Sequence, residues 1–178
     1  MNHINILYFK TSFGELILGS FENQLCLCDW QYRKMRSSID NRIQTGLDAS
    51  YIEENSEIIQ LTKNQLNEYF EGKREIFDIP LKLVGTDFQQ NVWNELIKIP
   101  YGKTETYLSL SRKLNNEKAI RAVASANGAN AISIIVPCHR IVGSDGKLVG
   151  YAGGIQAKKQ LLNLEMNNYD QQQKMKLF

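Results

Sequence analysis

The sequence lacks any long hydrophobic run, and this absence argues against a membrane-spanning chain. No apolar stretch of the 178 residues approaches the roughly 18 residues that a bilayer span needs. The first residues, Met1-Asn2-His3-Ile4-Asn5, lack a basic region that leads into an apolar one, so we expect no signal peptide. Repeats and low-complexity segments are missing too. With 43% hydrophobic and 22% charged residues, the composition is typical of a globular protein, which we expect in the cytoplasm.

Cysteine is scarce, and this scarcity argues against a disulfide scaffold or a zinc site. Three cysteines are an odd number in a chain without a secretion signal, so reduced thiols are expected. Cys26 and Cys28 would share one face of a strand, and a C-x-C pair can bind metal. His3 is the only other soft ligand nearby, and zinc sites usually show two pairs of ligands. We therefore interpret both cysteines as packed side chains and expect no metal at this pair.

The chain also has little net charge, but its basic and acidic residues are unevenly distributed along the sequence. The net charge is +2. Residues 1–85 hold 9 basic and 12 acidic residues, net −3, whereas residues 86–166 hold 10 and 6, net +4. A basic half can meet phosphates, although so small an excess also fits an ordinary solvated surface.

The first 85 residues predict a small α/β domain. Residues 6–30 have short strand-like runs with turn residues between them, typical of a hairpin. Residues 31–55 are polar and predict a loop with at most one short strand or helix. An apolar stripe predicts a helix over 56–71, capped by Asn55 or Ser56. Alternation over 77–83 predicts an irregular extended segment because it contains Pro80. We place a domain boundary near Val84-Gly85.

Residues 86–166 predict a mainly helical second domain. Thr86 to Gln89 has the spacing of a capping box, and two short helices, Tyr107 to Leu114 and Glu117 to Asn127, suggest a helix-turn-helix. A strand Ile132–Val136 and a hairpin that returns at Leu148-Val149 would make it a winged helix. The final helix would run from Ile155 to Met166. The polar residues 167–178 predict a flexible tail.

The two best candidates for a nucleophile and a base stand side by side between apolar runs. Cys138 and His139 follow Pro137, which cannot donate to a sheet ladder, so the backbone should leave regular structure there. Neighbours on a strand point to opposite faces. His139 would therefore need a bridging water or a bent backbone to take the thiol proton. A buried free cysteine beside a structural histidine is an equally good interpretation of these residues alone.

The longer stretch Val136-Pro137-Cys138-His139-Arg140-Ile141-Val142 resembles the active-site signature of the O6-alkylguanine-DNA alkyltransferases. The resemblance extends over residues 86–166 and is weaker before them. It implies a ribonuclease-H-like first domain, a helix-turn-helix that enters the minor groove of double-stranded DNA, and a monomer that acts without a cofactor. It also implies single-turnover repair of O6-alkylguanine, with O4-alkylthymine as a further candidate substrate.

The resemblance assigns roles in the reaction. Cys138 would attack the alkyl carbon and keep it as a thioether, after His139 takes its proton through a water. Glu165 would orient His139, and Tyr107 would donate toward guanine N3. The backbone carbonyls of Cys138 and Ile141 would accept from the guanine amino group. Without the resemblance, Tyr107 would be a packing residue and Glu165 an exposed helix end.

The resemblance also assigns roles in DNA binding. Arg121, followed by Ala122 on a slim helix, would replace a flipped nucleotide in the stack. Asn130 would brace the turn near the cysteine. Tyr151 would form the aromatic wall of the base pocket, with the Ala152 backbone N–H near guanine O6. An alkyl-DNA sensor or regulator that does not react stays an alternative, as does a Cys-His hydrolase, although adjacency of the dyad disfavours the latter.

Two positions depart from the pattern of some relatives. Ala152 replaces a serine, so a backbone donor survives but a hydroxyl contact is lost. Ser133 stands where some relatives have a proline that lines the alkyl pocket, which leaves the range of alkyl groups open.

Overall fold

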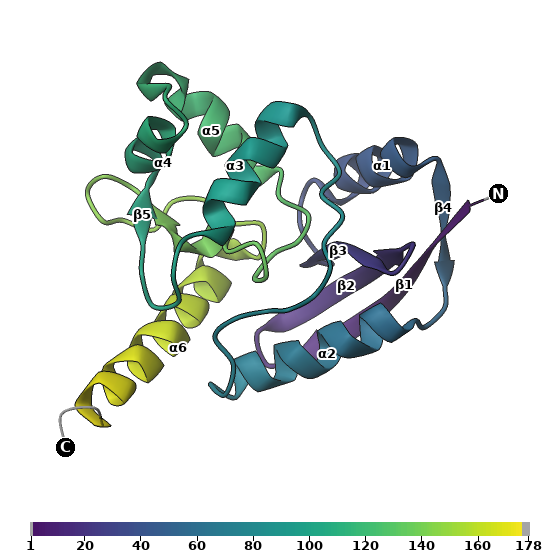
Figure 1. Ribbon diagram of the computed structural model, residues 1–178, viewed down its shortest axis with the longest axis horizontal. Coiled ribbons are helices and arrows are strands. Elements are labelled where there is room, and N and C mark those ends of the chain that lie inside the picture. The colour runs from purple at the N-terminus through teal and green to yellow at the C-terminus, as the bar shows by residue number, and fades with distance from the viewer. Residues whose placement is uncertain (1, 176–178) are drawn as a thin grey trace.

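The first half of the chain is a four-stranded sheet with a helix on each face. The structure, a computed structural model, describes residues 2–175. Strands β1 (Asn2–Thr11), β2 (Gly14–Phe21) and β3 (Gln24–Trp30) form an antiparallel meander, and β4 (Ala49–Glu53) pairs parallel to β1. The strand order is β3-β2-β1-β4, and Figure 1 shows α2 running along this sheet. The predicted hairpin is confirmed, and it is extended by β1.

The polar segment after β3 holds more regular structure than its sequence indicated. It forms both a helix, α1 (Arg36–Leu47), and strand β4. Only Ile39 and Ile43 of α1 are buried, so its apolar stripe is too narrow to be recognised from periodicity. Helix α2 (Glu57–Phe70) matches its prediction and begins after Ser56, whose hydroxyl accepts from the Ile59 N–H.

The two faces of the sheet belong to different hydrophobic clusters, and this separates the paired cysteines. Cys28 packs in the cluster that includes α2 and the second half of the chain, whereas Cys26 packs in the cluster under α1. The prediction that they share a face is wrong. A register shift opposite Gly19 and Ser20 inserts one extra residue, and a β-bulge of this kind breaks the alternation of side chains.

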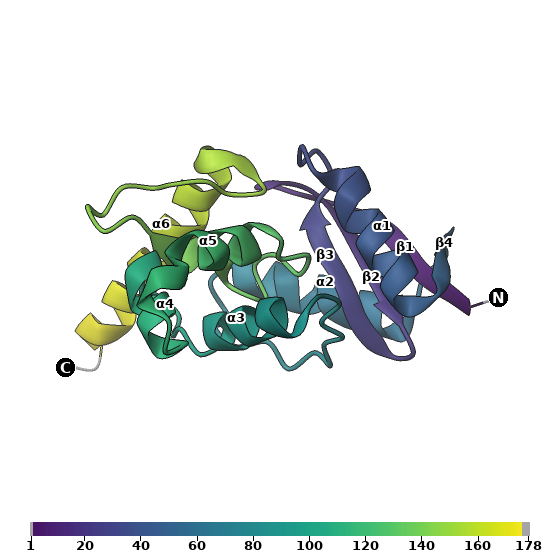
Figure 2. The same cartoon turned by 90° about the horizontal axis from the view of Figure 1, so that it is seen from above.

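The second half is a cluster of short helices that leads into one long helix, as Figures 1 and 2 show. It contains α3 (Asp87–Ile97), β5 (Glu105–Thr106), α4 (Tyr107–Lys113), two short 3-10 turns, η1 (Glu117–Ala119) and η2 (Cys138–Arg140), α5 (Ile120–Gly128), β6 (Ile141–Val142) and α6 (Gly154–Met175). Thr86 caps α3 in the predicted capping box. Helices α4 and α5 form the predicted helix-turn-helix. None of the helices within residues 2–175 is long and apolar enough to cross a membrane.

Three predictions for this half need correction. The expected strand Ile132–Val136 is instead a folded loop, because Ile134 adopts a left-handed φ of 74° and the Val136 N–H bonds back to the Ile132 carbonyl. Residues 148–149 form no strand, and β6 pairs with β5 instead. The expected tail is helical as far as Met175. Residues 176–178 of that tail lie outside the described residues.

The helical extension of α6 is held against the rest of the chain. Asn168 donates a hydrogen bond of 3.1 Å to the Tyr101 hydroxyl. The Lys103 ammonium lies 4.2 Å from the centre of the Tyr169 ring, a cation–π contact. These contacts explain why a polar sequence continues the helix past residue 166.

Candidate active site

The loop that replaces the expected strand places the Cys138 thiol in the wall of a cavity. The cavity measures about 590 Å³, a volume that holds a small aromatic ligand. Its lining comes from five segments, which are residues 32–35, Tyr107, the region 124–130 around the end of α5, Cys138 and the loop Gly150–Gly154. The thiol is accordingly almost buried, and burial raises the pKa of Cys138 above its ordinary value. Its resting form is the thiol, so a nearby base is needed to generate a thiolate.

His139 supplies a base that is neutral in the resting protein. The imidazole is fully buried, and burial lowers its pKa even though Glu165 opposes this shift. Its Nε2 lies 2.8 Å from Glu165 Oε1, so Nε2–H donates a hydrogen bond to the ionised Glu165 and Nδ1 of the neutral ring carries no proton. Nδ1 is buried and has no hydrogen-bond partner within the described part of the chain. A histidine in this state can take a proton on Nδ1.

The Glu165 carboxylate is the centre of a buried polar cluster that sequence reasoning only partly found. Besides His139, it accepts two hydrogen bonds of 2.9 Å from the Arg140 guanidinium, one of 2.7 Å from the Tyr69 hydroxyl and one of 3.2 Å from the Gly102 N–H. Burial alone would raise its pKa, but His139 and Arg140 together outweigh burial, and the pKa of Glu165 lies well below its ordinary value. The carboxylate is therefore ionised at every physiological pH.

Several residues of this site carried no predicted role, among them Arg140, Tyr69 and Lys158. Arg140 belongs to the recognised signature, and it also donates to the Ile99 carbonyl at 2.5 Å. Tyr69 was interpreted only as one residue of the apolar stripe of α2. Lys158 is fully buried, and its ammonium donates to the carbonyls of Val149 and Gly150 at the start of the cavity loop.

The sequence position of Lys158 could have identified it as a buried lysine. It lies three and four residues before Leu161 and Leu162, on the buried face of the final helix. A lysine within an apolar stripe needs a buried partner for its ammonium. Burial lowers the pKa of Lys158 to about 8, so near neutral pH it carries a positive charge that lowers the pKa of Cys138.

Two aromatic side chains flank the cavity. Tyr107 begins α4, and burial raises the pKa of its phenol, with the charge of a Cys138 thiolate adding to the effect. Tyr151 packs edge to face against Trp30, with ring centres 6.0 Å apart, and against His139 at 6.4 Å. Its buried hydroxyl has no hydrogen-bond partner among the described residues. Gly153 must be small, since a Cβ there would lie 2.5 Å from the Trp30 ring.

The remaining predicted site residues fall into two places. Asn130 and Ala152 line the cavity, and the Asn130 side chain bonds the Val136 carbonyl at 2.8 Å and the Ile132 N–H at 2.9 Å, which braces the loop before Cys138. Arg121 and Ala122 are exposed on α5 and lie outside the cavity lining.

Two further positions that the sequence placed near the cavity, Ile141 and Ser133, do not line it. Ile141 is fully buried in β6 and does not line the cavity. Ser133 does not line it either, because its hydroxyl points to Asp29 at a distance of 3.1 Å. The Ser133 side chain is therefore not part of the cavity wall.

Removing the Tyr69 hydroxyl tests whether the first half of the chain supports the base. Tyr69→Phe should lower the free energy of unfolding by about 1.5–3 kcal/mol, the typical contribution of a hydrogen bond to a charged group. It should also slow the reaction of the Cys138 thiol, because Glu165 loses one of the donors that fix its orientation. Urea unfolding and single-turnover kinetics measure the two effects. Tyr8→Phe, at a half-exposed tyrosine of β1, is the matched control, and equal effects in both variants would contradict the prediction.

Comparison with known proteins agrees with this arrangement of fold and site. A family model described as the ribonuclease-like domain of 6-O-methylguanine DNA methyltransferase matches residues 6–83, and one described as the DNA binding domain matches residues 87–167. A methylated-DNA–protein-cysteine methyltransferase from Methanosarcina barkeri is 43% identical over 159 residues, which cover 89% of this chain and 95% of the relative.

Comparison with solved structures supports the same family. The crystal structure of Mycobacterium tuberculosis OGT in complex with DNA superposes with a TM-score of 0.78 at 37% identity, and it covers 93% of this chain and 94% of that one. A two-domain fold with a cysteine in the cavity between a DNA-binding domain and a ribonuclease-like domain defines a class of enzymes that move an alkyl group from DNA onto themselves. The chain belongs to the family of methylated-DNA–protein-cysteine methyltransferases.

Proposed function

We propose that this chain restores O6-alkylguanine in double-stranded DNA by transferring the alkyl group to Cys138, once per molecule. The observation that carries the assignment is a buried cysteine in a cavity wall next to a neutral histidine that is held by an ionised glutamate. Direct alkyl repair is the activity of the family. The identity of the damaged base, the residue roles and the monomeric state are our proposals.

The proposed chemistry uses side chains of this protein and one bridging water. His139 Nδ1 takes the Cys138 proton through a bridging water, and the neutral state of the buried imidazole suits it for this step. The thiolate attacks the alkyl carbon in line, a carbon–sulfur bond forms, and the carbon–oxygen bond breaks with its electron pair going to guanine O6. Tyr107 donates a proton or a hydrogen bond toward guanine N3 as charge develops there. A thioether is a poor leaving group, so the protein reacts once.

Binding of the target base follows from the walls of the cavity. A base within a duplex is inaccessible unless it is flipped out, and the cavity between Tyr107 and Tyr151 offers aromatic surfaces for it. The Cys138 carbonyl would receive the guanine amino group, and the Ala152 N–H would face O6. The Ile141 carbonyl, which the resemblance also assigns to the amino group, belongs to a residue outside the cavity lining. Arg121, exposed on α5, would fill the gap in the duplex. O4-alkylthymine has a similar alkyl–oxygen bond and stays a second candidate.

The three cysteines support a reducing compartment. All are free thiols, and a reactive thiol needs protection from oxidation. We therefore propose a cytoplasmic protein, and the resemblance to the family adds the expectation of a monomer.

Intact mass after incubation with duplex DNA that carries one O6-methylguanine tests the function. We expect a gain of one methylene mass per molecule, located on the peptide that contains Cys138, and no gain in Cys138→Ser. Consumption of several equivalents would point to a turnover enzyme such as a hydrolase. Tight binding without any mass gain would indicate a damage sensor.

A further inference from the structure

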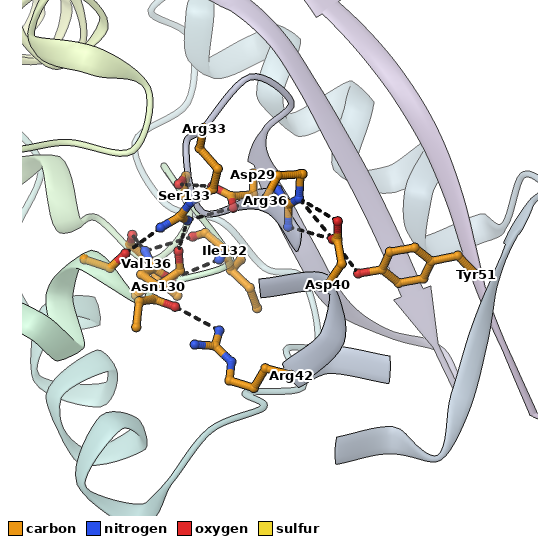
Figure 3. Close-up of polar contacts among 12 residues, drawn as sticks. Asp29, Arg33, Arg36, Asp40, Arg42, Tyr51, Asn130, Ile132, Ser133 and Val136 are labelled. Carbon is orange, nitrogen blue, oxygen red and sulfur yellow. Dashed lines mark hydrogen bonds and ion pairs between the residues drawn. The ribbon is translucent and has the colours of Figure 1, made fainter. Parts of the chain in front are cut away.

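The cavity wall around the end of α5 is held by charged side chains of the first half of the chain. We propose that Arg33, oriented by Asp29, is a positioning residue that fixes both the Cys138 loop and helix α5 for alkyl transfer. This inference rests on the proposed function and deepens it, because it assigns part of the site to the ribonuclease-like domain. Figure 3 shows the residues involved.

Asp29 is the anchor of this arrangement. It lies near the end of β3, and its carboxylate is fully buried. It accepts from Arg33 Nη1 at 2.8 Å, from Arg36 Nη1 at 2.9 Å and from the Ser133 hydroxyl at 3.1 Å. A buried carboxylate is tolerated only when it is paired and hydrogen-bonded. Asp29 therefore holds the Arg33 guanidinium in one orientation.

Arginines of the first domain cap the end of α5. Arg33 donates to the Gly128 carbonyl at 2.6 Å and to the Asn130 carbonyl at 3.0 Å, and Arg42 donates to the Ala129 carbonyl between them at 2.8 Å. The last carbonyls of a helix lack partners within the helix and carry a partial negative charge. Three successive carbonyls are thus satisfied from another domain.

A short chain of hydrogen bonds connects this cap to the nucleophile. The Asn130 amide donates to the Val136 carbonyl at 2.8 Å, and the Cys138 N–H donates to the same carbonyl at 2.8 Å. Movement of the backbone at residues 128–130 would consequently move Cys138. The opposite end of α5 carries the exposed Arg121. One cap therefore sets the distance between the nucleophile and the proposed flipping residue.

Arginine is required for this role, because its planar fork serves two carbonyls and a carboxylate at once. A lysine has the same charge, but its ammonium is a single point on a flexible stem. Arg33→Lys keeps the positive charge that acts on Cys138 and removes the fork. A loss of rate in this variant reports geometry and not a change of charge near the thiol.

Arg33→Lys is compared with wild type and with Arg74→Lys, a matched change in the same domain at an arginine that contacts none of residues 128–130. Alkylation of Cys138 is timed with free O6-benzylguanine and with duplex O6-methylguanine. Amide hydrogen exchange is followed over residues 128–138 and over β2. We expect both reactions to slow about tenfold or more in Arg33→Lys, with faster exchange in 128–138 and unchanged exchange in β2. Arg74→Lys should match wild type.

Wild-type rates and wild-type exchange in Arg33→Lys would overturn the positioning role, as would equal acceleration of exchange in β2. If Arg33→Lys does not fold, Arg42→Gln decides, because it removes the Ala129 contact while the Arg33 fork stays in place, and it should give a smaller change in the same direction and the same segment. Failure of wild type to become alkylated would overturn the proposed function instead. The exchange measurement would still decide the role of Arg33.

Discussion

Replacing Glu165 by glutamine should lower the free energy of unfolding by about 3–5 kcal/mol, the usual effect of removing one partner of a buried ion pair. The change preserves size but leaves the Arg140 guanidinium, itself buried, without its counter-charge. Urea unfolding measures the loss. Glu117→Gln makes the same chemical change in an exposed pair with Arg112 and should cost at most about 1 kcal/mol. Similar losses in both variants would contradict a buried pair.

The same variant should slow alkylation of Cys138 by about 10²–10⁴-fold, the range of general base contributions. In Glu165→Gln the amide can either donate to or accept from Nε2 of His139, so the ring is no longer held in the tautomer with its proton on Nε2. Nδ1 would then not always be free to accept the Cys138 proton. Single-turnover rates measured across pH report this directly. If the profile of rate against pH stays unchanged in the folded variant, His139 does not act as the base.

The stability difference between wild type and Glu165→Gln should depend on pH in a defined direction. The folded pKa of Glu165 is depressed, whereas the unfolded value is about 4.3. A depressed acid stabilises the folded state above its unfolded pKa and loses this contribution as the pH falls toward the folded pKa. The difference should therefore be full at neutral pH and shrink below about pH 4.3. A difference that grows on acidification would contradict this assignment.

Replacing Arg121 by alanine should reduce repair of duplex DNA by about 10²–10³-fold, because flipping a base costs a few kcal/mol and the side chain that fills the gap is lost. Reaction with free O6-benzylguanine should stay at the wild-type rate if that ligand fits the cavity, since no base is flipped. Stability should change little, because Arg121 is exposed and exposed side chains contribute little to stability. Single-turnover rates on the two substrates separate the effects.

Arg121→Lys is the matched control for charge. It preserves attraction to phosphates but has a different shape, so a contact with phosphate alone predicts near-normal repair in this variant. Equal losses of Arg121→Ala on duplex and on free base would contradict the role in flipping and would point to a defect of the cavity itself.

The sequence alone determined the secondary structure wherever a local signal was strong. The α2 and α3 helices have wide apolar stripes and side-chain caps, so the span of α2 matches its prediction and α3 begins at the predicted capping box. The reactive pair was recognisable because seven consecutive residues around Cys138 have few accidental matches. These features depend on neighbours within a few residues, so they can be recognised without knowing the fold.

Other features were decided only by tertiary contacts. The apolar run before Cys138 has the pattern of a strand, but it is surrounded by core on all sides, and a buried loop and a buried strand have the same composition. Cys26 and Cys28 were separated by a bulge that depends on the pairing of β2 and β3. The tail became helical through contacts of Asn168 and Tyr169 with residues far away in the chain.

The residues of the site also fall into those that the sequence indicated and those that only the tertiary structure revealed. The resemblance predicted roles for Cys138, His139 and Glu165, whereas the contacts of Tyr69 and Arg33 became visible only when the two domains were brought together. Tyr69 lies 96 residues from Glu165, and Arg33 lies 97 residues from Asn130, so no pattern within one segment encodes either contact. Local signals therefore determined the elements, and the signature around Cys138 indicated the nucleophile. Packing of one domain on the other supports Glu165 through Tyr69 and holds the loop that carries the thiol.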